Sequence, residues 1–417
     1  MVLAVTTLGT IFYSIIVFLL VILLLVGLLL FARDKLSPKG DVELLINDRK
    51  ITVSPGSNLL TTLSSNSIFL PSACGGGGTC GMCKCQILEG GGSILPTETG
   101  FFTRKEQHDH WRLGCQVKVR EPLKIKLPEA VLGIKKWECE VVSNRNVATF
   151  IKEFVVRLPE GEKLEFEPGG YIQIDVPHYE VSFKDFDIQN EFRPDWDAYK
   201  MWDLGIKNRT ETFRAYSMAN YPAEKNLIKL NIRIATPPWD NVKKQFMNVP
   251  PGICSSFIFS RKPGDKVMIS GPYGEFHIKK TNSEMIYIGG GAGMAPLRSH
   301  IFHLFHTLKT SRKVSYWYGA RSLREVFYED EFRAIEKEFP NFTFNLALSE
   351  PLPQDNWTGY TGFIHQVLYD NYLSKLDEPE DIEYYFCGPP MMNNAVVKML
   401  DNLGIPAENI SFDDFGI

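Results

Sequence analysis

The sequence predicts a multidomain α+β and α/β chain: an N-terminal transmembrane helix, a small domain with a cysteine-rich loop, an antiparallel β-barrel, and a parallel-sheet domain. Three observations carry this prediction. Residues 1–32 contain no charged side chain, residues 72–86 contain four cysteines, and apolar strands alternate with helical stretches after Pro272. Since 417 residues are too many for one hydrophobic core, roughly two to three domains are expected.

The composition of the chain is that of a globular protein. Hydrophobic residues make up 44% of the sequence and aromatic residues 12%. The formal net charge is -4, and acidic and basic residues are well mixed along the chain. Because nucleic-acid binding requires a basic stripe or patch, no nucleic-acid partner is expected.

The N-terminal segment is expected to anchor the chain in a membrane. Residues 11–32 are almost continuously apolar, and ~20 such residues allow a helix to cross a bilayer. A cleavable signal peptide is the alternative, but no basic residue precedes the run and no small-residue cleavage site follows it. Arg33, Lys35 and Lys39 come directly after the run, so the positive-inside rule places everything after residue 36 in the cytoplasm.

The cysteine-rich loop has four possible interpretations. A disulfide framework is disfavoured because cytoplasmic thiols are kept reduced. A phosphate cradle would lead into a helix, whereas cysteines interrupt these glycines and a strand-like segment follows. Structural zinc usually uses two C-x2-4-C pairs. Here Cys74, Cys80 and Cys83 form C-x5-C-x2-C, and Cys115 follows after 31 intervening residues.

Three closely spaced cysteines and one distant cysteine favour a 2Fe-2S site, with zinc as the alternative. A loop around such a cluster turns its backbone N–H groups toward sulfur, often at positive φ, which Gly75–Gly78 and Gly81 reach without a Cβ penalty. Cys85 could replace a ligand, but a small buried core thiol is the favoured interpretation.

The segment before the loop is expected to form a hairpin and a short helix. The hairpin turns at Asn47-Asp48, and Ser57 or Asn58 caps the helix. This order of hairpin, helix and cluster loop resembles plant-type ferredoxin domains, which have a β-grasp fold. The first gap between cysteines is one residue longer than the plant-type C-x4-C-x2-C spacing, as it also is in the adrenodoxin branch.

The remaining residues show two successive patterns of predicted secondary structure. Alternating segments predict antiparallel strands of a small barrel at 137–147, 170–177 and 226–235. Later apolar strands at 284–290, 313–320, 342–349 and 383–388 alternate with helical stretches near 294–309, 327–338, 363–374 and 391–403, which predicts a parallel sheet with crossover helices. The predicted domains are 1–36, 37–130, 131–278 and 279–417.

Two segments of the barrel could bind a flavin. "RAYSMAN" offers a cation, an aromatic ring and a hydroxyl, and "GICSSF" offers backbone amides for phosphates. An ordinary alternating strand followed by a solvated turn is the alternative.

The sheet domain begins with "YIGGGAGMAPLRSH", a strand that runs through glycines into a helix whose first turn holds Pro296. This arrangement is typical of pyrophosphate binding, and proline is favourable at the first helical position. Cys387 ends a later strand, at the edge where ligands of parallel sheets bind, with a structural cysteine as the alternative. His300, His303 and His306 share a helical face, and an amphipathic surface is favoured over a zinc site.

The motifs "RAYS", "GICSS", "GGGAGMAP" and "CGPP", in this order, resemble the ferredoxin–NADP reductase superfamily. Together with the anchor and the ferredoxin domain, the whole chain resembles the F subunit of the bacterial sodium-translocating NADH:quinone oxidoreductase. An acidic, aromatic insert at 178–213 is similar to an insertion of that family.

The resemblance implies an FAD site and an NADH site. Arg214 would bind flavin phosphate, Tyr216 would stack on the isoalloxazine, Ser217 would approach N5, and Phe415 would cover the other ring face. The FAD pyrophosphate would lie on Gly252, Ile253, Cys254 and Ser255. Gly291, Gly293 and Pro296 would bind NADH, and Cys387 would lie near the nicotinamide.

The resemblance also implies a reaction and partners. NADH delivers two electrons and a 2Fe-2S cluster accepts one, so FAD must stand between them. Electrons would continue to other membrane subunits and indirectly to quinone, at the bacterial inner membrane, with the catalytic domains on the cytoplasmic side. Arg321 could contact a 2′-phosphate, so the residues alone leave NADPH open. A multicomponent oxygenase reductase and a membrane-tethered zinc adaptor are the alternatives.

Overall fold

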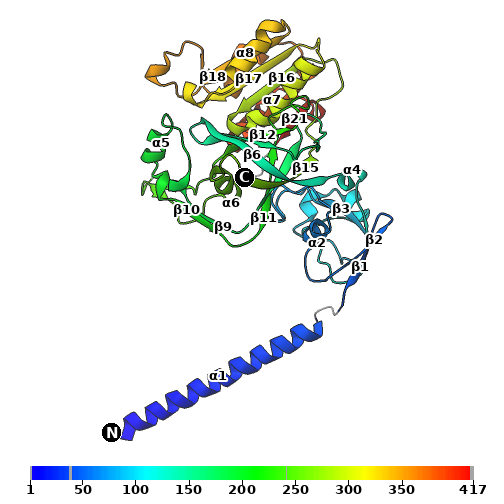
Figure 1. The fold of residues 1–417 in the computed structure, drawn as a ribbon, viewed down its shortest axis with the longest axis vertical. Helices are drawn as coiled ribbons and strands as arrows, with labels where there is room; N and C mark the ends of the chain where they lie inside the picture. Colours follow the sequence, from blue (N-terminus) through cyan, green and yellow to red (C-terminus); the bar gives the residue numbers. More distant parts are fainter. Residues whose placement is uncertain (1, 37–39, 241, 414–417) are drawn as a thin grey trace. The chain divides into compact units, whose positions relative to one another are not determined.

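The computed structural model describes residues 2–36, 40–240 and 242–413, excluding the side chains of 2–11, 32–36 and 130. The chain begins with a single long helix, α1 (Val2–Leu36), shown in Figure 1. Within this helix, the segment Phe12–Phe31 has a mean hydropathy of 3.4, and none of the segment is buried. The predicted apolar helix is therefore confirmed as a candidate membrane span.

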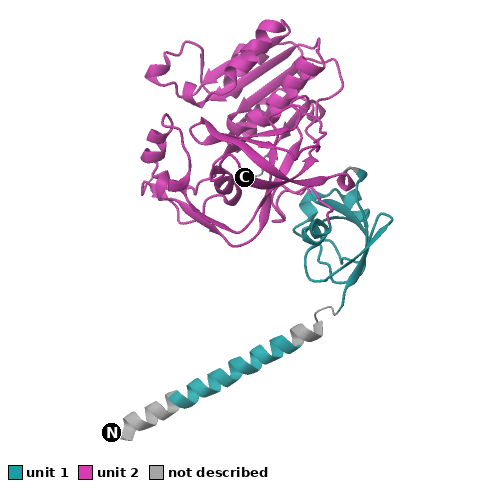
Figure 2. Ribbon diagram, in the orientation of Figure 1, with its two compact units in different colours: residues 1–66, 83–129 teal, residues 67–82, 130–417 magenta. Residues whose placement is uncertain are grey.

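The chain forms two compact units (Figure 2). Unit 1 contains residues 1–66 and 83–129, and unit 2 contains residues 67–82 and 130–417. Cys83 and Cys115 therefore belong to unit 1, whereas Cys74 and Cys80 belong to unit 2.

Unit 1 is built on a mixed sheet with the strand order β2-β1-β5-β3-β4. The predicted hairpin is confirmed, with Asn47 at φ 51° in its turn. Asn58, rather than Ser57, caps helix α2, because its side chain accepts a hydrogen bond from Thr61 N at 2.8 Å. The elements are β1 (Val42–Ile46), β2 (Arg49–Val53), α2 (Leu59–Ser65), β3 (Lys84–Glu89), α3 (Arg104–His108), β4 (Trp111–Leu113), β5 (Leu123–Lys126) and α4 (Glu129–Leu132), which extends past the end of the unit.

Unit 2 begins with an antiparallel sheet in the order β11-β8-β15-β6-β7-β12. A bridge between Met218 and Leu230 connects the two outer strands, so the sheet closes into the predicted barrel. Its interior is a continuous apolar core that includes Val141, Phe154 and Ile172. The strands are β6 (Lys135–Ala148), β7 (Ile151–Arg157), β8 (Tyr171–Val176), β11 (Thr212–Ser217), β12 (Leu227–Arg233) and β15 (Lys266–Tyr273).

The insert predicted at 178–213 folds onto the barrel core. Its buried side chains Phe183, Phe186 and Trp196 join that core. The insert and the following hairpin contain β9 (Tyr179–Ser182), α5 (Arg193–Ala198), β10 (Gly205–Asn208), β13 (Trp239–Asp240) and β14 (Gln245–Phe246). A short helix, α6 (Ile253–Phe259), then returns the chain to the barrel.

The C-terminal part of unit 2 is a parallel sheet in the order β19-β18-β17-β16-β20-β21, which confirms the predicted α/β domain (Figure 1). Apolar cores lie on both faces. Leu297 and Phe332 of α7 and α8 belong to one core, and Leu368 and Leu400 of α9 and α10 belong to the other. The strands are β16 (Met285–Gly290), β17 (Val314–Ala320), β18 (Phe342–Leu348), β19 (Tyr360–Thr361), β20 (Glu383–Cys387) and β21 (Ile410–Asp413). The helices are α7 (Met294–Phe302), α8 (Glu329–Glu338), α9 (Ile364–Asn371) and α10 (Pro390–Asn402).

The first crossover helix differs in detail from the expectation. A 3-10 turn, Gly291–Gly293, precedes α7, and a π-helical turn, His303–Thr307, follows it. Pro296 is therefore the third residue of α7 rather than the first. The first turn of a helix still tolerates proline there, because no backbone N–H in that turn has an intrahelical partner.

Candidate functional site

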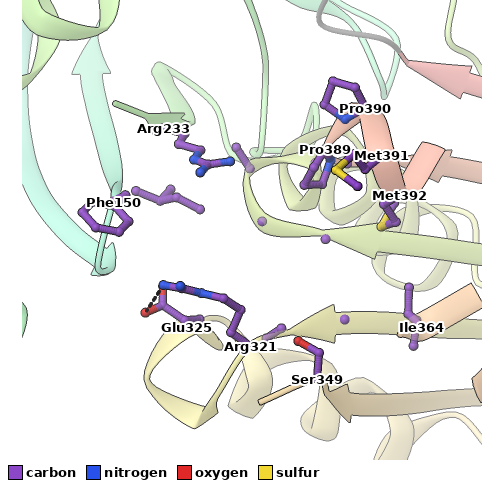
Figure 3. A pocket seen from close by; sticks show the side chains of 18 of the residues that line it. Phe150, Arg233, Arg321, Glu325, Ser349, Ile364, Pro389, Pro390, Met391 and Met392 are labelled. Carbon is purple, nitrogen blue, oxygen red and sulfur yellow. Dashed lines mark ion pairs between the residues drawn. The ribbon is translucent and has the colours of Figure 1, made fainter. Parts of the chain in front are cut away.

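A cavity of about 740 Å³ lies within unit 2, between the barrel and the carboxyl ends of the parallel strands. Figure 3 shows Phe150 and Arg233 from the barrel facing Arg321 and Glu325 from the sheet domain. The volume is in the range of small-molecule sites, ~300–1,000 Å³. Ligands of parallel sheets bind at this edge, so the cavity is the candidate nucleotide site.

The glycine turn between β16 and α7 lines this cavity. Gly291 has φ 55°, in the left-handed region that favours glycine. A Cβ on Gly293 would lie 2.0 Å from the carbonyl oxygen of Cys387, so only glycine fits where the start of α7 approaches the end of β20. The sequence-predicted Gly291, Gly293 and Pro296 thus belong to one tight strand–turn–helix unit, the local structure that a pyrophosphate requires.

Two guanidinium groups also line the cavity, Arg233 from β12 and Arg321 from the loop after β17. Arg321 lies 4.0 Å from the carboxylate of Glu325. Glu325 in turn accepts a hydrogen bond from the backbone N–H of Thr149 at 3.2 Å. The surrounding cavity walls lower the pKa of Arg233 by removing water from part of its side chain, and the charge of Arg321 lowers it further. The rest of the Arg233 residue is exposed to solvent.

Cys387 is the last residue of β20 and is fully buried. The next residues, Gly388 and Pro389, line the cavity. Within the described part of the chain, Cys387 itself does not line it. The structure therefore places Cys387 at the predicted edge of the sheet, one residue behind the cavity wall.

The flavin residues expected in the first barrel motif, Arg214, Tyr216 and Ser217, all lie on β11. Arg214 donates hydrogen bonds to Thr212 Oγ1 at 2.9 Å and to the carbonyl oxygen of Phe213 at 2.7 Å. The Ser217 hydroxyl donates to Asp413 Oδ2 at 2.6 Å, which joins β11 to the last strand of the sheet. Alternation along β11 places Arg214 and Tyr216 on the same face of the strand.

The segment Gly252–Ser255 begins α6, with Gly252 at the N-cap. A Cβ on Gly252 would lie 2.7 Å from the side chain of Ala235, so the close approach of these two segments requires glycine. Ser255 Oγ accepts a hydrogen bond from Ala235 N at 3.1 Å and donates to the carbonyl oxygen of Gly252 at 3.3 Å. Ile253 accepts a hydrogen bond from the hydroxyl of Tyr179 through its carbonyl oxygen.

Cys254 now has a structural partner, which sequence reasoning did not find. Its buried thiol lies beside the Tyr216 hydroxyl. Burial, followed by the neighbouring Cys254, raises the pKa of Tyr216, and burial raises the pKa of Cys254 to about 12. Both groups are therefore neutral, and the pair orients the Tyr216 ring.

The four predicted metal-ligating cysteines occur as two close pairs. Within unit 2, the sulfur atoms of Cys74 and Cys80 lie 3.4 Å apart. This contact lowers the pKa of Cys74 to about 3 and raises that of Cys80. Within unit 1, a hydrogen bond with Cys115 raises the pKa of Cys83. In the described part of the chain, no group of three or more His, Cys, Asp or Glu side chains has metal-binding geometry.

The chemistry of the loop nevertheless fits an iron–sulfur cluster. Thiolates are the ligands that iron–sulfur clusters use. Gly75, Gly76, Gly78 and Gly81 all have positive φ values between 65° and 91°, as the sequence predicted for a loop that turns its N–H groups inward. The prediction is wrong for Gly77, which does not have a positive φ. Cys85 is fully buried, and its thiol donates to the carbonyl oxygen of Arg112 at 3.8 Å, which favours the core thiol interpretation.

Two other predicted features have different outcomes. Phe415 lies outside the described residues, so its position over the flavin stays a prediction. His300 is buried, and its Nε2 lies 2.9 Å and 3.1 Å from the carbonyl oxygens of Phe276 and Pro168. It therefore holds α7 against the barrel, and only His303 and His306 remain near the surface.

Sequence reasoning missed four groups around the site: Thr149, Arg233, Glu325 and Asp413. Arg233 and Glu325 stand at the ends of elements that face the cavity, a position that the strand boundaries could have indicated. Thr149 and Asp413 come into place only through contacts between distant segments, 176 and 196 residues apart in the chain. No sequence motif signals such contacts.

Three family models match successive parts of the chain. They are a 2Fe-2S iron-sulfur cluster binding domain over residues 44–120, an oxidoreductase FAD-binding domain over 199–278, and an oxidoreductase NAD-binding domain over 287–398. Fold and site thus define the class of the protein: a flavin- and NAD-binding oxidoreductase with its own 2Fe-2S domain and a candidate membrane helix.

Solved structures of such reductases share this fold. Amycolatopsis cytochrome P450 reductase GcoB aligns with a TM-score of 0.63 at 22% identity, over 90% of this chain and 98% of that one. The ferredoxin reductase in carbazole 1,9a-dioxygenase aligns with a TM-score of 0.57 at 25% identity, over the same shares of both chains.

Sequence relatives are much closer. The F subunit of the Na(+)-translocating NADH-quinone reductase of Klebsiella pneumoniae is 56% identical over 406 residues, 97% of this chain and 98% of that one. The corresponding protein of Pseudomonas aeruginosa is 55% identical over 407 residues, with the same coverage. This chain belongs to the family of Na(+)-translocating NADH-quinone reductase F subunits. The relatives favour this family over the oxygenase-reductase and zinc-adaptor alternatives.

Proposed function

We propose that this chain is the electron-entry subunit of a Na+-translocating NADH-quinone reductase. It oxidises NADH and passes electrons through FAD and a 2Fe-2S cluster to other subunits of the complex. The observation that carries the proposal is one chain that combines a candidate membrane span, a glycine-rich four-cysteine pattern, the flavin strand β11 and the glycine turn at Gly291–Gly293. Bound FAD supplies the conversion between hydride transfer and one-electron transfer.

Residues on β11 and at the start of α6 would hold the flavin. Arg214 offers a cation for its phosphates, and the contact with Cys254 would orient the Tyr216 ring for stacking. Because Ser217 donates its own proton to Asp413, its oxygen lone pairs can accept an N–H of the bound ring. Gly252, Ile253, Cys254 and Ser255 would approach the pyrophosphate, and Phe415 would cover the ring.

Residues around the cavity would bind NADH. The turn at Gly291 and Gly293, which lines the cavity, would face the pyrophosphate, with Pro296 in the helix that follows. Cys387 would lie behind the nicotinamide end. The carboxylate of Glu325 supports NADH over NADPH. It neutralises Arg321, the cation that a 2′-phosphate would need, and it would repel that phosphate.

Cys74, Cys80, Cys83 and Cys115 would ligate the cluster, as the pattern of three cysteines plus one requires. The helix Phe12–Phe31 would cross the bacterial inner membrane, with both units on the cytoplasmic side, where NADH is available. The lipid-facing helix would also hold the cluster near the membrane subunits that accept its electrons.

An absorption spectrum and an activity assay together test this proposal. The purified chain should show flavin and iron–sulfur bands, and NADH should bleach both. After co-purification with the membrane subunits, quinone reduction should increase with Na+. A colourless protein that contains zinc would refute the redox function. If the chain instead passed its electrons to a soluble oxygenase, and quinone reduction did not respond to Na+, the oxygenase-reductase alternative would be favoured.

A further inference from the structure

The segment that leads into Cys83, residues 67–82, is packed with the barrel and belongs to unit 2 (Figure 2). This segment, called here the docked segment, carries Cys74 and Cys80. It contacts the barrel strands β8 and β11. Two of the four proposed cluster ligands are therefore held on the same unit as the flavin strand.

The first half of the docked segment lies directly against these strands. Gln173 of β8 donates a side-chain hydrogen bond to the carbonyl oxygen of Leu70 at 3.4 Å. A Cβ on Gly75 would lie 2.3 Å from Arg214 Nη1 and 2.6 Å from the carbonyl oxygen of Phe213. Gly75 also has φ 65°, so only glycine permits this close approach. The segment thus touches β11 at the proposed flavin-binding arginine.

At its far end, the docked segment contacts β8 through Met82. The Tyr171 hydroxyl donates a hydrogen bond to Met82 Sδ at 3.9 Å. Met82 is 37% exposed, so it is not enclosed in a core. A methionine sulfur is polarizable and adapts readily to an aromatic partner. Tyr171 is therefore the barrel side chain that holds this end of the segment.

Tyr171 is fixed from the barrel side. Its ring is 6% exposed and stacks on Tyr273 at 5.3 Å, with an interplanar angle of 17°. In the β8–β11 ladder, Tyr171 lies directly opposite Ser217, and side chains that are directly opposite share one face of a sheet. One buried tyrosine is therefore a neighbour both of Ser217, the residue expected beside flavin N5, and of Met82 in the docked segment.

We propose that Tyr171 is a positioning residue that docks the cluster-bearing segment on the flavin strand through its contact with Met82. This inference rests on the proposed function, in which one electron leaves reduced FAD for each electron that the cluster gains, and no bond is formed or broken. Such a transfer requires the chain to hold donor and acceptor close together, and Tyr171 contacts the elements that would bear both.

Hydrogen–deuterium exchange tests the docking without any electron transfer. Tyr171→Phe removes the donor hydroxyl and Met82→Leu removes the sulfur acceptor, and both keep the size of the side chain. In the full-length protein with both cofactors bound, each variant should raise the amide exchange rate of residues 67–82 about three-fold or more, as expected for loss of one sulfur contact. The double variant should exchange no faster than the faster single variant, because both changes remove the same contact.

Stopped-flow absorbance measures the consequence for electron transfer. After mixing with NADH, the flavin should be reduced at the parental rate in both variants. Reduction of the cluster should then be slower by about three-fold or more. Flavin and iron contents should match those of the parent, and so should amide exchange in residues 42–66, since neither change reaches the core of unit 1.

Tyr273→Phe and Met268→Leu are the matched controls. Tyr273 is 6% exposed, as Tyr171 is, but its hydroxyl lies 3.0 Å from Ser270 Oγ within the barrel. Met268 is 37% exposed, as Met82 is, but it lies on β15. Both controls should match the parent in amide exchange and in cluster reduction.

Parental exchange of residues 67–82 in both Tyr171→Phe and Met82→Leu would overturn the inference, and so would equal changes in the control variants. Faster exchange with an unchanged rate of cluster reduction would also overturn it, because the contact would then not serve electron transfer. If NADH reduces neither flavin nor cluster in the parent protein, the proposed function itself fails, whereas the exchange rates still decide whether Tyr171 docks the segment.

Discussion

Single side chains decide whether the cysteine loop can hold a cluster. Cys74 and Cys80 are already in sulfur contact at 3.4 Å, and the surrounding glycines adopt the positive φ values that such a loop needs. Cys85, two positions after Cys83, is instead enclosed in the core of unit 1 at 0% exposure. The residue type alone does not distinguish a ligand from a core thiol, whereas burial and partners do.

Replacing Cys80 by alanine should therefore abolish the paramagnetic signal of the reduced cluster, because the cluster loses one of its four proposed thiolate ligands. FAD content and hydride transfer from NADH to flavin should stay at the parental level. The measurement is electron paramagnetic resonance of the dithionite-reduced protein, together with flavin absorbance. Cys85→Ala is the matched control and should keep the signal. The reverse pattern would make Cys85 the ligand in place of Cys80.

Among the elements, α7 is hydrogen-bonded to the barrel by two buried side chains, Arg298, which donates to the carbonyl oxygen of Ala219 at 2.8 Å, and His300, which alone of the two titrates near neutral pH. Burial lowers the pKa of His300 to about 4, and His277 and His303 act in the same direction. The hydrogen-bond distances to Phe276 and Pro168 require an N–H on Nε2, which neutral histidine can supply. Its pKa in the unfolded chain is ~6.5, so the folded state disfavours protonation.

The free energy of unfolding should therefore fall as the pH decreases from about 6.5 toward 4, since protonation favours the unfolded chain. At pH 5 the loss from this group is about 2 kcal/mol relative to pH 7. His300→Gln keeps an N–H donor but does not titrate, so its urea midpoint should depend less on pH than that of the parent. His108→Gln, at an exposed position, should behave like the parent. Identical pH dependence in His300→Gln and the parent would contradict the argument.

At the scale of the whole molecule, the membrane helix is separate from the packed cores. None of Phe12–Phe31 is buried, whereas unit 2 encloses its own barrel core and the two cores of the parallel sheet. Unit 1 likewise buries Leu44, Leu59 and Leu113 without help from α1. Domains that bury their own cores fold alone, and a lipid-facing helix contributes contacts mainly to lipid and partner subunits.

Deleting residues 1–33 should therefore yield a soluble, yellow-brown protein. It should still transfer electrons from NADH to ferricyanide at a rate close to that of the full chain, because every proposed cofactor residue follows residue 70. It should fail to restore quinone reduction in membranes that lack this chain. Full restoration by the truncated protein would show that the helix does not position the cluster and would return the soluble oxygenase-reductase alternative.

The sequence by itself determined the order of the domains and the chemistry available to each. Hydrophobic periodicity, the uncharged N-terminal run and the spacing of Cys74, Cys80, Cys83 and Cys115 are local properties, and local patterns can be recognised without coordinates. For the same reason the glycine turn before α7 was predictable, because its tight geometry involves consecutive residues. The structure differed from this prediction only in the position of Pro296, which is the third residue of α7 rather than the first.

Tertiary structure alone decided how distant side chains meet. The partnerships of Cys254 with Tyr216, Ser217 with Asp413, and Arg321 with Glu325 set the orientation of groups that the sequence could only name. Such contacts depend on how the elements pack, and packing is a property of the whole chain that neither residue type nor spacing encodes locally.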